Sequence, residues 1–91
     1  MPTNNEIQRK ARIFALFGDP TRLKILSLLS QKKTVKVSDI ASKVNMSIAC
    51  VSHHLQLLKD NAVVGSKREG NNIYYQLIHD PLVKNLQSLV K

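Results

Sequence analysis

The chain has 91 residues, which suits one domain with a modest core. Fourteen Lys and Arg against six Asp and Glu give a net charge of +8. Such a charge favours a polyanionic partner such as nucleic acid, or an anionic membrane surface. The alternative is that the basic surface only keeps the protein in solution. A single cysteine excludes a disulfide within the chain, and no apolar run approaches the roughly 18 residues of a membrane span, so we expect a cytoplasmic protein.

The first third of the chain predicts two helices. Apolar residues at helical spacing from Ile7 to Phe17, followed by Gly18, predict a helix over residues 5–17. Asp19 is a good cap and Pro20 a good first helical residue, so a second helix should run to about residue 31. The next segment, QKKTVK, is a polar and basic connection.

The middle of the chain predicts a helix-turn-helix. The segment VSDIASKV has one short apolar stripe and predicts a helix near residues 37–44, which Asn45 can end because Asn tolerates the left-handed conformation. Two residues later Ser47 can cap a helix over residues 48 to about 60. Two helices joined by so short a turn are typical of a helix-turn-helix.

After residue 62 the hydrophobic period changes. Val63 to Lys67 and Ile73 to Leu77 are rich in β-branched and aromatic residues, and the EGNN between them suits a hairpin turn. Asp80 and Pro81 then begin a last helix. A helix-turn-helix followed by a basic two-stranded ribbon predicts a mainly α, winged helix-turn-helix domain of five helices, with the wing between the fourth and the fifth.

The segments FGDPTRLKILSLLS, SDIASKVNMS, VSHHLQLLKDNAVV and KREGNNIYYQL resemble the ArsR/SmtB family of small dimeric repressors over residues 10–78. The resemblance implies an elongated homodimer, joined through its first and last helices, on an operator with imperfect two-fold symmetry. The expected interface consists of the apolar residues of those two helices: Ile7, Ala11, Phe14, Leu82, Val83, Leu86, Leu89 and Val90.

The helix over residues 48–60 has two different faces when it is wound at about 100° per residue. One face is apolar and belongs to the core: Ile48, Val51, Leu55 and Leu58. The opposite stripe has small or hydrogen-bonding side chains: Ala49, Ser52, His53 and Gln56. Gln56 can pair with adenine, His53 can donate to guanine or phosphate, and Ala49 can meet a thymine methyl. The alternative is an ordinary solvated face.

Further DNA contacts are expected at the helix start, at its end and in the wing. Ser47 and the free N–H groups at the helix start suit a phosphate. The residues expected to reach the backbone or the minor groove from the wing are Lys67, Arg68, Asn71 and Asn72. Lys59 and Lys43 are weaker phosphate candidates, and Arg22 and Lys24 are expected only to be solvated. His54 falls at the boundary of the core, so we expect it to pack or hydrogen-bond within the domain.

Neither metal site that the resemblance would imply is expected here. One family site uses a Cys-x-Cys pair at the entry to the third helix, where this chain has Lys36 and Ser38. The other lies on the last helix, where His79 and Asp80 are out of register and Pro81 stands at the His position. Zinc requires about four ligands. Asp80 is therefore expected to cap the last helix, and we expect no metal and no cofactor.

Cys50 leaves three interpretations open. It lies three and four residues before His53 and His54, a spacing that could hold a metal on a helix. Oxidation or alkylation beside the DNA-facing stripe could instead weaken DNA binding. Inert packing of a small side chain is the simplest interpretation, and Cys50 remains a possible redox residue.

No Ser/His/Asp arrangement, paired acid cluster or glycine-rich phosphate loop points to an enzyme. The sequence favours a sequence-specific regulator of transcription, a repressor that binds a double-stranded operator as a homodimer, with any effector unidentified. The alternative is a winged helix that binds protein or RNA without operator specificity.

Overall fold

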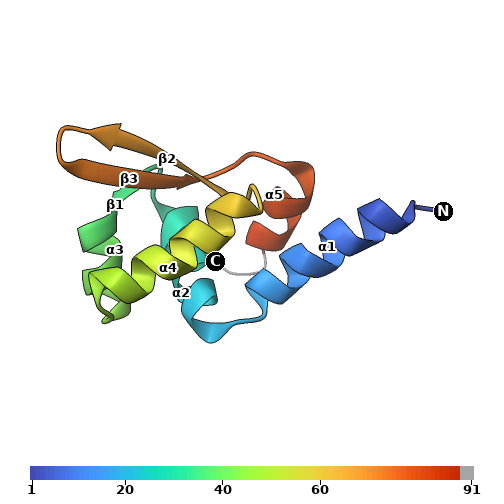
Figure 1. Cartoon of the computed structure of the whole chain (residues 1–91), viewed down its shortest axis with the longest axis horizontal. Helices are drawn as coiled ribbons and strands as arrows, with labels where there is room; N and C mark the ends of the chain where they lie inside the picture. The colour runs from blue at the N-terminus through green and yellow to red at the C-terminus, as the bar shows by residue number, and fades with distance from the viewer. Residues whose placement is uncertain (89–91) are drawn as a thin grey trace.

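The computed structural model describes residues 1–88. In this range the order of elements is α1 (Asn4–Phe17), α2 (Pro20–Gln31), β1 (Val35–Lys36), α3 (Val37–Val44), α4 (Ile48–Asp60), β2 (Val64–Glu69), β3 (Asn72–Leu77) and α5 (Pro81–Gln87). Figure 1 shows the β2–β3 hairpin projecting beside α3 and α4 at one end of the molecule, while α1 extends to the other end and α5 lies beside α1 nearer the middle. The predicted winged helix-turn-helix fold is confirmed.

The helix boundaries follow from caps that the sequence shows directly. In four of the helices a side-chain oxygen just before the first turn accepts a hydrogen bond from a backbone N–H of that turn; the four caps are Thr3, Asp19, Ser47 and Asp80. Such bonds satisfy donors that a helix start leaves unpaired. Asn45 ends α3 with φ 57° and ψ 51°, the left-handed conformation expected of it.

One apolar core joins all the helices to the sheet. The side chains that lie wholly inside it come from every helix and from the start of the hairpin: Ile13, Ile25, Leu26, Ile40, Val51, Leu55, Leu58, Val63, Val64 and Val83. On α2 the core takes Ile25, Leu26 and Leu29. The helix-turn-helix therefore sits on a core shared with α1 and α5.

The sheet has one strand more than the sequence predicted. The segment QKKTVK, predicted to be a polar connection, contains β1. Val35 and Lys36 of β1 pair antiparallel with Tyr75 and Tyr74 of β3, so the strand order is β1-β3-β2. The prediction was wrong because two residues are too short to show a period, and β1 becomes a strand only by pairing with β3. The new strand ties the entry of α3 to the base of the wing.

The hairpin matches its prediction closely. β2 and β3 pair from Val64 with Leu77 to Glu69 with Asn72, and Gly70 occupies the turn with φ +61°. Glycine adopts this conformation without the steric penalty of a side chain. The pairing extends the first predicted strand by two residues, to Glu69, and so sets the tip of the wing at Gly70 and Asn71.

Candidate nucleic-acid interface

The helix α4 is held to the body of the protein by three side chains. Val51, Leu55 and Leu58 are 0% exposed, so one face of α4 is completely covered by the core. Its first turn is capped by Ser47, whose side chain accepts a 3.1 Å hydrogen bond from the N–H of Cys50. Because the buried face is fixed, the direction of the opposite face is fixed too.

That opposite face carries most of the stripe predicted to meet DNA. Ala49, His53 and Gln56 are exposed, whereas Ser52 is half-buried at the edge of the stripe. Gln56 donates a 2.8 Å hydrogen bond from Nε2 to Oδ1 of Asp60 one turn later. This leaves the Gln56 side chain oriented along the helix surface, with its carbonyl oxygen free to accept.

Ile48 departs from its prediction. The helical winding placed it in the core with Val51 and Leu55, but its side chain is 52% exposed. Winding assigns a direction around the helix axis; it does not tell whether another element reaches far enough along that axis to cover the first turn. Ile48 therefore belongs to the accessible surface of α4.

A polar cluster connects α4 to the start of α2. His54 is half-buried, and its Nδ1 lies 3.4 Å from Nη1 of Arg22. Arg22 also donates from Nε to the carbonyl oxygen of Leu16 at 2.9 Å, so the expectation that Arg22 is merely solvated was wrong. His54, as predicted, makes its contact within the domain.

Asp19 completes this cluster. The hydrogen bond from the backbone N–H of Arg22 is the main cause that holds the pKa of Asp19 below its ordinary value of 3.8; partial burial opposes it, and the positive charge of Arg22 assists. The carboxylate thus stays ionised at neutral pH, where it caps α2. The sequence showed the cap, but the link from α2 to His54 connects residues 32 positions apart and leaves no local signal.

The wing presents its basic and amide side chains to solvent. Lys67, Arg68, Asn71 and Asn72 are all exposed. Lys67 forms a 3.1 Å ion pair with Glu69 on the same strand, and both side chains are more than half exposed. Within residues 1–88 the structure gives Arg68 no acidic partner, so its charge is available to another molecule.

More lysines lie on the neighbouring surface. Lys59 is exposed in the last turn of α4, and Lys43 is exposed in the last turn of α3. Lys43 lines a shallow depression together with Lys32, Lys36 and Tyr74, and Asp39 is the acidic residue among its lining. The helix-turn-helix end of the molecule is therefore strongly positive, which is what a polyanion requires.

The outer helices carry the predicted interface only in part. Ile7, Ala11 and Phe14 are exposed on α1, with Ile7 at 47% and Phe14 at 53%. Leu82 is half-buried, whereas Val83 is 0% exposed and Leu86 only 7%. Those two were assigned wrongly, because they fill the protein's own core beneath α5; Leu89 and Val90 lie outside the described residues.

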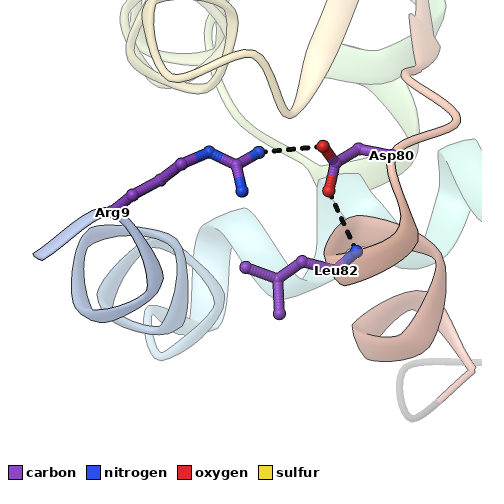
Figure 2. A network of polar contacts seen from close by, with 3 residues as sticks. All are labelled: Arg9, Asp80 and Leu82. Carbon is purple, nitrogen blue, oxygen red and sulfur yellow. Dashed lines mark hydrogen bonds and ion pairs between the residues drawn. The ribbon is translucent and has the colours of Figure 1, made fainter. Parts of the chain in front are cut away.

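An ion pair holds α5 against α1. Figure 2 shows Asp80 between its two partners: Oδ2 accepts from Nη2 of Arg9 at 2.9 Å, and Oδ1 accepts from the N–H of Leu82 at 2.9 Å. Partial burial raises the pKa of Asp80, but the backbone hydrogen bonds and the charge of Arg9 outweigh it, and the pKa lies below 3.8. Asp80 caps α5, as predicted, and also joins the two outer helices.

Cys50 is half-buried on the flank of α4. Across residues 1–88, no group of three or more His, Cys, Asp or Glu side chains is placed to hold a metal ion. Cys50, His53 and His54 therefore do not form a candidate metal site. His79 is exposed beside the cap of α5. In the same range no helix is both long enough and apolar enough to cross a lipid bilayer.

The sequence of this chain is similar to those of known regulators of transcription. Residues 19–64 match the family model described as "Bacterial regulatory protein, arsR family". Over 84 residues the chain is 40% identical to an HTH-type transcriptional regulator of Methanocaldococcus jannaschii, an alignment that covers 91% of the chain and 92% of that relative. The chain spans about three fifths of the length of two other, longer curated relatives.

Solved structures agree with the sequence comparison. The antimony-specific transcriptional repressor AntR superposes with a TM-score of 0.85 at 33% identity, covering 96% of this chain and 78% of that one. The homodimeric winged helix-turn-helix DNA-binding domain of Mb0332 from Mycobacterium bovis, a possible ArsR-family regulator, superposes with a TM-score of 0.83 at 29% identity, covering 98% and 83%. The chain belongs to the ArsR family and is a DNA-binding regulator of transcription rather than an enzyme.

Proposed function

We propose that the protein is a cytoplasmic repressor that binds an imperfect inverted repeat in double-stranded DNA as a homodimer. The accessible face of α4 enters the major groove of each half-site, and the wing follows the neighbouring backbone. A dimer on such a site would exclude other proteins from a promoter that overlaps it.

The observation that carries this proposal is the division of α4 into two faces. Leu55 is 0% exposed, while its neighbour Gln56 is exposed and lies in line with Ala49 and His53. A helix anchored on one side and lined on the other with small and hydrogen-bonding groups can fit against base edges. Gln56 is assigned to adenine, and His53 to guanine or a phosphate.

Charge supports the same orientation. Arg68 and Lys67 extend from the wing, and Lys59 from the end of α4, on a chain of net charge +8. Contacts of this kind give salt-dependent affinity without base recognition. Ser47 at the start of α4, and Asn71 and Asn72 at the tip of the wing, are assigned to sugar or phosphate oxygens.

Dimerisation is assigned to the exposed apolar face of α1 and the adjoining edge of α5. Ile7 and Phe14 are about half exposed on α1, and Leu82 is half-buried on α5, so apolar surface on both helices is left for a partner subunit to cover. The Mb0332 domain, described as homodimeric, has the same fold. A dimer of this kind presents two α4 helices to a two-fold symmetric site.

A metal ion bound at the entry of α3 is not assigned as the effector of this protein. Lys36 and Ser38 occupy the positions at the entry of α3 where the family resemblance would require thiolates, and an ammonium group repels a cation. Cys50 is the remaining thiol, and its oxidation on the flank of α4 is the redox response open to this chain.

DNA binding is tested by fluorescence anisotropy with a labelled duplex from the promoter region of the protein's own operon, against an excess of unrelated duplex. His53→Ala and Gln56→Ala should each weaken binding to the specific duplex by about 5- to 150-fold, the range for a base-contacting side chain. Gln31→Ala, which changes an exposed glutamine at the end of α2, is the matched control and should bind as the unchanged protein does.

Two outcomes would contradict the proposal. One is equal affinity for the promoter and the unrelated duplex at every salt concentration. The other is unchanged binding after both α4 substitutions, which is the behaviour expected of a winged helix that binds protein or RNA instead.

The dimer is tested separately by sedimentation at micromolar concentration. Phe14→Ala should shift the protein toward monomer, whereas Leu57→Ala, which removes a 37% exposed leucine from α4, should not. A monomer before any substitution would refute the proposed assembly.

A further inference from the structure

Ile48 is an exposed apolar side chain in an otherwise polar setting. Apart from Met1, the large apolar residues of the described chain that are markedly exposed are Ile7, Phe14, Ile48 and Leu57. Ile7 and Phe14 form the face assigned to the dimer, and Leu57 lies at the opposite end of α4. Ile48, at 52% exposure, is in the first turn of α4, next to the Ser47 cap.

Its position on α4 borders the stripe assigned to the major groove. Ile48 and Ser52 are four residues apart and so lie about 40° from each other around the helix axis, in successive turns. Ala49 follows it directly and is exposed. In a helix-turn-helix the N-terminal residues of the second helix are the ones that meet base edges.

The major groove offers one apolar group to such a side chain. The four bases present hydrogen-bond donors and acceptors there, and thymine alone adds a methyl group at C5. An aliphatic side chain gains no hydrogen bond from any base edge, but it can bury that methyl group. Ile48 also has no donor or acceptor that a water molecule or a phosphate could use.

A second protein would fit this surface poorly. The accessible or half-buried residues next to Ile48 along the first turns of α4 are small or polar, namely Ser47, Ala49 and Ser52. Protein interfaces require a contiguous, well-packed apolar centre, which one isoleucine in this setting does not provide. The basic side chains around the same end of the molecule favour DNA instead.

We propose that Ile48 recognises a thymine by packing against its C5 methyl group, and so makes α4 selective for a T·A pair at one position of each half-site. This inference rests on the proposed binding of α4 in the major groove. It adds a specificity-determining residue to that site and makes the contact apolar, in contrast to the hydrogen bonds assigned to Gln56 and His53.

The experiment removes the methyl group from the DNA and the side chain from the protein. A duplex selected from a random library by the unchanged protein is prepared with each thymine replaced, one at a time, by deoxyuridine, which lacks only the C5 methyl. Replacing the single thymine that Ile48 contacts in one half-site should weaken binding about three- to tenfold, the effect of losing the burial of roughly one methyl group. Ile48→Ala should weaken binding to the thymine duplex similarly and be insensitive to that replacement.

Controls separate this contact from folding and from general binding. Ile48→Ala should leave thermal unfolding nearly unchanged, because half of the side chain is already exposed. Ile48→Val, which keeps a branched apolar group, should retain sensitivity to the methyl group. Leu57→Ala should respond to deoxyuridine as the unchanged protein does.

Three results would overturn the assignment. The first is a selected duplex in which no deoxyuridine lowers affinity. The second is an Ile48→Ala variant that remains sensitive to the same replacement. The third is a change of oligomeric state in Ile48→Ala, which would mean that a second copy covers the side chain. If the library yields no preferred sequence at all, the proposed operator recognition fails instead.

Discussion

Substitutions at two adjacent residues of α4 should separate the packing of this helix against the core from its recognition of DNA. Leu55 is 0% exposed and Gln56 is exposed, although they are neighbours in the chain. Leu55→Ala removes three carbon atoms from the core, worth about 0.8 kcal/mol each, and leaves a cavity, so we expect a loss of about 3–4 kcal/mol in the free energy of unfolding. For a domain of this size the midpoint of thermal unfolding should fall by roughly 15–25 °C.

Gln56→Ala should behave in the opposite way. It removes one exposed bond between side chains four residues apart, the bond to Asp60, worth about 0.2–0.5 kcal/mol, so the unfolding midpoint should move by less than about 4 °C. Its affinity for the promoter duplex should nevertheless fall by about 1–3 kcal/mol. Leu55→Ala, with a starting stability of about 5–14 kcal/mol, should remain folded at 20 °C and bind DNA within about threefold of the unchanged protein.

Both variants are measured by thermal and urea denaturation at one protein concentration, since dimerisation makes the midpoint depend on concentration. Anisotropy on the same samples gives the affinity for DNA. The division of α4 into an anchoring and a recognition face is refuted if Leu55→Ala lowers the unfolding midpoint by less than about 5 °C, because α4 would then not be anchored by this side chain. It is equally refuted if the two variants lose stability and affinity in parallel.

Three further substitutions test a charge in the wing, the carboxylate that caps α5 and a backbone position with positive φ. Arg68→Ala should reduce the slope of log affinity against log salt by about 1.8, which is one phosphate contact of about 0.9 in each protomer of the dimer. The charge-matched control Lys84→Ala on α5 should leave the slope unchanged, and equal slopes for the two variants would contradict the wing assignment. The pKa of Asp80 lies below 3.8 in the folded protein, so the ionised Asp80 stabilises the fold fully above that value, and this stabilisation is lost as the pH falls through the lowered pKa. Asp80→Asn should therefore make the fall in the free energy of unfolding at acid pH shallower. An unaltered fall would count against this role of Asp80. Ala62 has φ 59° just after α4, so Ala62→Gly should raise the free energy of unfolding by about 0.5–1 kcal/mol in urea denaturation, and a destabilised variant would show that the left-handed residue is not strained.

The elements of this fold were largely predictable because their signals are local. Asp19, Ser47 and Asp80 each cap a helix through a bond to a backbone N–H two or three residues further on, so the cap and its helix are adjacent in the chain. Asn45 ends α3 by its own conformational preference. The spacing of Val51, Leu55 and Leu58 likewise identified the buried face of α4, because a helix repeats its direction every 3.6 residues.

The sequence by itself thus determined the order of the five helices and the hairpin, the helix boundaries, the charge and the polar stripe on α4. Only the tertiary structure decided what covers each residue. It made a strand of Val35 and Lys36 by pairing them with β3, buried the Val83 side chain of α5 in the core, and left Ile48 uncovered at the start of α4. The physical reason is the same in each case: period and capping act within a few residues, whereas burial and strand pairing depend on elements that lie far away in the chain.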